Sequence, residues 1–266
     1  MKSITTENNH GVVTLWLNRP EVHNAFHEEM ILEIIDCLEE LSQDTSCNIL
    51  LIKGKGKSFC AGADLNWMRS ALAYTYEQNL AESLNLSKCF QLLYSFPKPT
   101  IAVVQGAAIG GANGLLAACD FALAHDDCVF SLSEVKIGLI PACISPYVIK
   151  RVGEFNAKSL MLSGKRINGV RAERLGLVNF SGNAQEVESE LTLFLNQLKT
   201  SGPQALTECK KLINEVVNNW TFEEAYSNTA KMIAETRKSE EGQEGMAAFL
   251  EKRKPKWVEK FESSRT

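Results

Sequence analysis

Two turns of small residues are the features of this sequence best suited to chemistry. Gly110-Gly111 lies between an expected strand and an apolar helix, so the N–H groups left unpaired at the helix start could face an anion. Ala61-Gly62-Ala63-Asp64 is a second such turn, after another expected strand. One N–H from each turn, aimed at the same oxygen, would form an oxyanion hole. The alternative is that the glycines only permit tight turns and close helix packing.

Glu134 is the third candidate, because it stands between two apolar stretches, 129–133 and 135–141. Burial at such a position would raise the pKa of the carboxyl group toward the range useful for proton transfer. The alternative is a carboxylate on a solvated turn or one paired with Lys136. Glu134 and the two turns therefore predict a site that handles a negatively charged oxygen and a proton.

Other catalytic and binding motifs fail on residue type. Gly54-Lys55-Gly56-Lys57-Ser58 is similar to a phosphate-binding loop, but that loop needs a glycine where Leu51 stands. No serine has glycines two residues away on both sides, which excludes a nucleophile elbow. His23, His27 and their neighbouring glutamates do not form His-Glu-x-x-His, so we expect no metal site.

Composition excludes several classes of protein. The 266 residues contain 32 Asp and Glu against 28 Lys and Arg, a formal charge of −4 that argues against a nucleic-acid partner. The 8 cysteines form no Cys-x-x-Cys pair, and most stand in apolar surroundings, so neither disulfides nor zinc are expected. No run reaches the roughly 20 apolar residues of a membrane helix. A reducing cytoplasm fits these features best.

Strands and helices alternate over most of the chain, which predicts an α/β protein. Apolar runs predict strands at 11–17, 48–53, 100–105, 121–124 and 129–132. Helical spacing predicts helices at 27–42 and 72–95, and in the last third at 185–199, 203–218, 221–237 and 241–252. We therefore expect an α/β core over residues 1–200 and a helical region over 201–266.

Several segments together resemble the crotonase superfamily, the enoyl-CoA hydratase/isomerase family. They are Leu17-Asn18-Arg19-Pro20 with Asn24-Ala25, Phe59 to Leu65, Val104 to Leu115, Ala118-Cys119-Asp120, Glu134 with Gly138 to Pro141, and Glu244 to Arg253. The resemblance implies a spiral of ββα units with a helical C-terminal trimerisation region, as a homotrimer or a dimer of trimers. It also implies an acyl-CoA thioester as substrate. No separate cofactor is implied, because coenzyme A is part of that substrate.

The resemblance also assigns roles within the site. The N–H groups of Ala63 and Gly111 would bind the thioester oxygen, and Glu134 would be an acid/base group beside the α- and β-carbons. The remaining substrate and coenzyme A contacts would come from Ala61, Gly62, Asp64, Leu65, Asn66, Gly110, Gly114, Pro141 and Lys252. Asn66 replaces a frequent lysine or arginine, so Lys252 or a neighbouring tail lysine could supply the phosphate contact from an adjacent subunit.

Gly114 departs from the family pattern, because the hydratases carry a first glutamate at this position. Glu134 alone would then have to activate water and supply the proton. The stretches 62–68, 110–115 and 132–142 are similar to bacterial methylglutaconyl-CoA hydratases, which also lack that glutamate and whose substrate has a distal carboxylate. Two alternatives stay open: an isomerase that moves a proton between the α- and γ-carbons of a 3-enoyl-CoA, and a CoA-ester- or RNA-binding protein without turnover. The pathway, leucine or terpenoid breakdown or general fatty-acid oxidation, also stays open.

Overall fold

The computed structural model describes residues 2–258, and the chain divides into two compact units. The first unit contains the residues up to Leu191 except Pro97–Pro99. The second unit contains Pro97–Pro99 and the residues from Thr192 onward. The division falls inside helix α7 (Ala184–Thr200).

A six-stranded sheet forms the centre of the first unit, in the order β1-β2-β3-β4-β6-β8. Its strands are β1 (Ile4–Asn9), β2 (Val12–Leu17), β3 (Ile49–Gly54), β4 (Thr100–Val104), β6 (Phe121–His125) and β8 (Phe180–Gly182). Only the β1–β2 pair is antiparallel, and β2 to β8 pair in parallel. The apolar runs of β3 and β4 are buried almost throughout, as strands covered on both faces must be.

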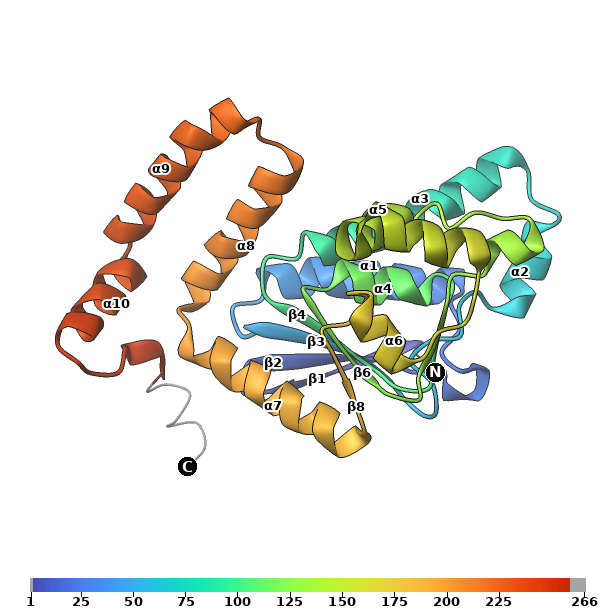
Figure 1. Ribbon diagram of the computed structural model, residues 1–266, viewed down its shortest axis with the longest axis horizontal. Helices are drawn as coiled ribbons and strands as arrows, with labels where there is room; N and C mark the ends of the chain where they lie inside the picture. Colours follow the sequence, from blue (N-terminus) through green and yellow to red (C-terminus); the bar gives the residue numbers. More distant parts are fainter. Residues whose placement is uncertain (1, 259–266) are drawn as a thin grey trace. The chain divides into compact units, whose positions relative to one another are not determined.

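Helices pack along one side of this sheet (Figure 1). They are α1 (Glu28–Gln43), α3 (Tyr76–Tyr94), α4 (Ala112–Ala118) and α5 (Ser145–Ser163). The apolar stripe predicted for α1 is buried, including Ile31, Ile34 and Leu38. The single helix predicted over 72–95 is shorter, because Thr75 caps α3 with a capping box, while α2 (Leu65–Ala71) is a separate helix before it.

A second, two-stranded sheet carries the elements of interest for function. It pairs β5 (Ala107–Ile109) with β7 (Val129–Ser131) in parallel. Parallel strands end at the same edge, so the residues after Ile109 and after Ser131 emerge side by side. An isolated bridge between Cys60 and Ala108 adds the segment that precedes Ala61. This small sheet therefore brings all three segments predicted to do chemistry to one place.

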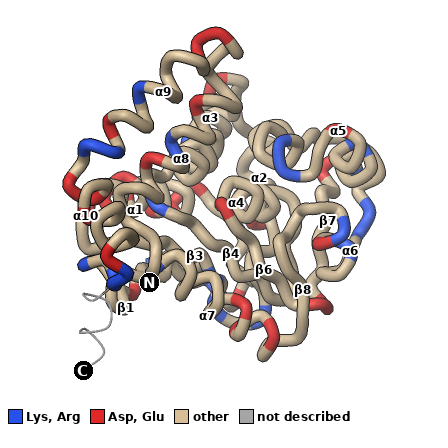
Figure 2. Tube along the Cα trace, turned by 60° about the vertical axis from the view of Figure 1, so that its left-hand side comes forward, with Lys and Arg blue, Asp and Glu red and all other residues tan. Residues whose placement is uncertain are grey.

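Three helices follow α7 in the described part of the second unit. They are α8 (Pro203–Asn218), α9 (Phe222–Lys238) and α10 (Glu240–Leu250). Acidic and basic residues are interspersed along α9 (Figure 2). Helix α10 ends before the predicted Lys252, which has a φ of 54°, and the next N–H, that of Arg253, returns to the carbonyl oxygen of Ala248.

Candidate active site

The Gly110-Gly111 turn joins the end of β5 to the start of α4. Gly110 has a φ of +55°, a conformation that favours glycine, and its N–H donates to the carbonyl oxygen of Ser131 at 2.8 Å. The turn is therefore attached to the last residue of β7. Gly111 precedes the first helical residue, and its N–H donates to no group within residues 2–258. An acceptor from a bound molecule could take this donor.

The Ala63 turn lies directly against the first one. Gly62 has a φ of +91°, and a Cβ atom there would lie 2.8 Å from the carbonyl oxygen of Ile109. Phe26 donates its N–H to Gly62 O at 2.7 Å and accepts from the N–H of Asp64 at 2.7 Å. The intervening N–H, that of Ala63, has no acceptor in the described part of the chain.

Phe26 packs against both of these turns. Its backbone bridges to Ala63, and its ring lies 3.4 Å from the position that a Cβ of Gly111 would take. The same aromatic residue thus contacts both turns. An oxyanion hole needs two such N–H groups from neighbouring segments.

Glu134 begins the short 3-10 helix Glu134–Ile137, immediately after β7. Its Oε1 atom lies 3.3 Å from the position that a Cβ of Gly110 would take, which puts the carboxylate beside the first turn. Its Oε2 atom is buried and has no hydrogen-bond partner among the described residues. Burial raises the pKa of Glu134 above its ordinary value, which suits a group that exchanges protons. No ion pair joins it to Lys136 within residues 2–258.

The side chain of Asp64 is bound to other groups of the protein. Its carboxylate accepts the N–H of Asn66 at 2.8 Å as the N-cap of α2, and it pairs with Arg19 at 2.9 Å. Burial alone would raise the pKa of Asp64, but these bonds together lower it below its usual value. In this structure Asp64 therefore supports the turn from within the protein.

Gly114 is buried in α4 behind the Gly110-Gly111 turn. A Cβ atom here would clash with the Cγ2 atom of Ile144 and would lie 2.8 Å from the ring of Phe90. Apolar side chains therefore occupy the space that a glutamate at position 114 would need. Neither Phe90 nor Ile144 could be identified from the sequence, because their role depends on packing between distant segments.

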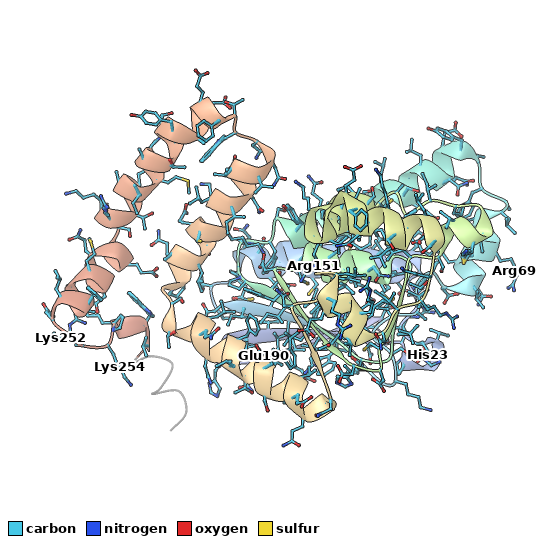
Figure 3. All side chains as sticks on the ribbon, viewed as in Figure 1. His23, Arg69, Arg151, Glu190, Lys252 and Lys254 are labelled. Atoms are coloured by element: carbon cyan, nitrogen blue, oxygen red, sulfur yellow. The ribbon has the colours of Figure 1, made fainter. Side chains whose placement is uncertain are left out.

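The remaining predicted contacts are distributed more widely. Leu65 is 75% exposed at the start of α2, and Asn66 accepts a hydrogen bond from Arg69, which Figure 3 shows on that helix. The Ala61 N–H donates to the carbonyl oxygen of His23, and Pro141 is half-buried. Lys252 belongs to the second unit, just after α10 (Figure 3).

Two further features concern the class of protein. Within residues 2–258, no three His, Cys, Asp or Glu side chains gather closely enough to hold a metal ion. In the same residues, no helix combines the length and apolar character that crossing a membrane requires.

Comparison with known proteins gives matches over nearly the whole chain. A family model described as enoyl-CoA hydratase/isomerase matches residues 7–260. A putative enoyl-CoA hydratase of Thermus thermophilus is 32% identical over 246 residues, covering 92% of this chain and 97% of the relative. A crotonyl-CoA hydratase of Syntrophomonas wolfei is 32% identical over 261 residues, covering 97% and 99%.

Solved structures agree with these sequence matches. The crystal structure of an enoyl-CoA hydratase from Shewanella pealeana is 42% identical with a TM-score of 0.91, and the match covers 96% of each chain. This similarity confirms the predicted crotonase-type α/β fold. The sequence matches and the fold lead to the same conclusion: this chain is an enzyme that belongs to the enoyl-CoA hydratase/isomerase family.

Proposed function

We propose that this enzyme adds water across the α,β double bond of an enoyl-CoA, with Glu134 as its acid/base group. The observation that carries the proposal is the buried, unpartnered Oε2 of Glu134 beside the turn that presents the unpaired Gly111 N–H. A proton carrier and an oxyanion donor next to each other are what addition to a conjugated thioester needs.

The residues divide the reaction between them. As Glu134 takes a proton from water, the hydroxide oxygen bonds to the β-carbon and the double-bond electrons move onto the thioester oxygen. The N–H groups of Ala63 and Gly111 stabilise the enolate that results. Glu134 then returns the proton to the α-carbon, so one carboxylate starts and ends the cycle ionised.

The substrate is proposed to be a branched diacid ester such as 3-methylglutaconyl-CoA. Phe90 and Ile144 fill the space beside Gly114, so position 114 supplies no second carboxylate to orient the water. A carboxylate at the far end of the acyl group could take over that task. The resemblance of residues 62–68, 110–115 and 132–142 to methylglutaconyl-CoA hydratases, as read from the sequence, supports this choice.

The apolar filling beside Gly114 also favours a second candidate reaction. Shifting a double bond from the 3- to the 2-position requires a base to remove an α-proton and return it to the γ-carbon, with no water to orient. One glutamate and an oxyanion hole suffice for that reaction. Isomerisation of a 3-enoyl-CoA is therefore the alternative activity of the same residues.

Assembly is proposed to be a homotrimer or a dimer of trimers formed through the helical second unit. Large apolar side chains remain uncovered on its helices, with Phe222 98% and Phe249 83% exposed in the single chain. Surfaces of this kind are typical of protein interfaces. Lys252, in the same unit, is proposed to reach the phosphates of coenzyme A bound to an adjacent subunit.

Separate incubations distinguish these possibilities. The purified protein is mixed with crotonyl-CoA, 3-methylglutaconyl-CoA or a 3-enoyl-CoA, and the products are identified by mass and by the absorbance of the conjugated thioester. Water addition to the branched diacid ester alone supports the proposal in full. Addition to both 2-enoyl esters contradicts the role of the distal carboxylate, and a double-bond shift without hydration supports the isomerase.

A further inference from the structure

Asn113 is a buried polar residue to which no role has been assigned so far. It lies in the first turn of α4 with no exposed surface. Its Nδ2 atom donates to the carbonyl oxygens of Ala108 at 3.1 Å, Gly110 at 3.0 Å and Ser131 at 3.0 Å. The opposite orientation of the amide would direct Oδ1 at these oxygens, so the bonds fix the amide as a donor.

The bond to Gly110 concerns the proposed oxyanion hole directly. The Gly110 C=O and the Gly111 N–H belong to one peptide group, and in a trans peptide they point in opposite directions. Asn113 holds the oxygen end with its side-chain amide and also with its backbone N–H at 3.0 Å. Fixing the oxygen therefore aims the Gly111 N–H. Hydrogen bonds to a carbonyl also polarise the peptide and strengthen its N–H as a donor.

The bonds to the two strands connect this peptide to the rest of the site. Ala108 lies in β5, the strand before the turn, and Ser131 ends β7, three residues before Glu134. Gly110 N–H donates to the same Ser131 oxygen. One amide thus joins the oxyanion peptide to the strand that leads to the proposed acid/base group.

We infer that Asn113 is a positioning residue. It aims the Gly111 N–H at the thioester oxygen, polarises this N–H, and fixes its position relative to Glu134. This inference rests on the proposed oxyanion hole. Asn113 touches no reacting atom in this scheme and acts only through the Gly110-Gly111 peptide. Its removal should therefore lower kcat more than it raises KM, because a misdirected donor fails chiefly in the transition state.

Infrared spectroscopy of a bound thioester provides the test. A saturated acyl-CoA with a ¹³C-labelled thioester carbonyl binds without turnover, and hydrogen bonds from the protein lower the stretching frequency of its C=O. The wild-type protein should show such a shift. In Asn113→Ala the band should move back toward its frequency in water, with kcat about 10- to 100-fold lower and KM within about threefold.

Asn113→Asp is a second variant of nearly the same shape. Its ionised carboxylate cannot donate, whereas its protonated form can donate one O–H. The frequency shift in Asn113→Asp should therefore be small at high pH and partly return as the pH falls. A residue that merely filled space would give no such pH dependence. If Asn113→Ala does not fold, Asn113→Asp still tests the role of the amide donor.

Asn156→Ala is the matched control, because the Asn156 amide also donates to backbone carbonyls, those of Val152 at 3.0 Å and Leu175 at 3.4 Å, without contacting either turn. It should keep the wild-type shift and kcat. A folded Asn113 variant with the full shift and full kcat overturns the inference about Asn113. A wild-type protein without any shift would instead contradict the oxyanion hole itself.

Discussion

The two turns that supply the proposed oxyanion donors are held in place by different forces. Ala63 is exposed, and the next residue, Asp64, is fixed by an ion pair with Arg19 at 2.9 Å. The Gly110-Gly111 turn is fixed by the neutral amide of buried Asn113. Ionic support depends on pH, whereas neutral hydrogen bonds between buried groups do not. The Ala63 turn is therefore supported by an ion pair, whereas the Gly110-Gly111 turn is supported by neutral hydrogen bonds.

The largest expected effect concerns Glu134, which lies beside the Gly110-Gly111 turn. Glu134→Gln should lower kcat at least about a hundredfold and leave acyl-CoA affinity within about tenfold, because it removes the proton carrier and keeps both N–H donors. Since burial raises the pKa of Glu134, and the ionised form is the base, activity in the wild type should rise with pH above the ordinary titration range of a glutamate. Steady-state kinetics of the variant and the wild type over a range of pH measures the loss of kcat and the pH dependence.

The control for this variant is Glu190→Gln, on α7 (Figure 3), which changes the same charge in another part of the chain. It should keep wild-type kcat and the same pH profile. Full activity in Glu134→Gln would show that another group carries the proton.

Gly111 allows a direct test of its N–H. Its φ of −53° is compatible with proline, so Gly111→Pro removes the donor without forcing a new φ at this residue. We expect a loss of about 3–4 kcal/mol of transition-state stabilisation, measured as kcat/KM. Gly111→Ala also adds a Cβ, 3.4 Å from the Phe26 ring, but keeps the N–H and should retain most activity. Equal losses in both variants would mean that packing, and not the donor, is the cause.

Asp64→Asn should weaken only the Ala63 turn, because the ion pair with Arg19 supports that turn. It keeps an oxygen that can cap α2 but loses the ion pair with Arg19, and we expect about 1–3 kcal/mol less stability at pH 7. Because the pKa of Asp64 is lowered by folding, the advantage of the wild type is present above the ordinary Asp pKa and is lost as pH falls through the lowered value. Urea unfolding from pH 7 to pH 3 measures the difference. A pH-independent difference would contradict the ionic account.

Gly114→Ala should have the smallest effect on chemistry and a measurable effect on stability. The added Cβ meets Ile144 and lies 2.8 Å from Phe90, so overpacking should cost about 1–3 kcal/mol in thermal or urea unfolding. Combining it with Ile144→Ala should cost less than the sum of the two single changes, since the new methyl partly fills the cavity. Strict additivity would show that the two positions do not share space.

The sequence predicts the elements whose patterns are local. Helix α8 begins and ends as predicted, with Pro203 at its start, and β3 and β4 follow from their apolar runs. Helix α5 is not predicted from the sequence, and in the structure its helical backbone is interrupted at Gly153, which has a φ of +73°. Strand β1 is largely polar and exposed, so its composition does not indicate a strand.

The residues of the candidate site also divide into those that a local sequence pattern indicates and those that depend on tertiary contacts. Gly110, Gly111, Ala63 and Glu134 can be proposed from the sequence, because small residues after strands and a carboxylate between apolar runs are local signals. The contacts of Asn113 with three separate carbonyl oxygens depend on how β5 and β7 pair. Likewise, the apolar filling beside Gly114 brings together residues from α3 and the segment before α5, which no local pattern indicates.

The most direct test of water addition by a single glutamate uses ¹⁸O-labelled water. The wild type and Glu134→Gln are incubated with 3-methylglutaconyl-CoA in this water, and the mass of the product is determined. The account predicts that the wild type forms a β-hydroxy ester whose new hydroxyl carries ¹⁸O, and that Glu134→Gln forms almost none. Labelled product at equal rates from both proteins, or no labelled product from the wild type, would contradict it.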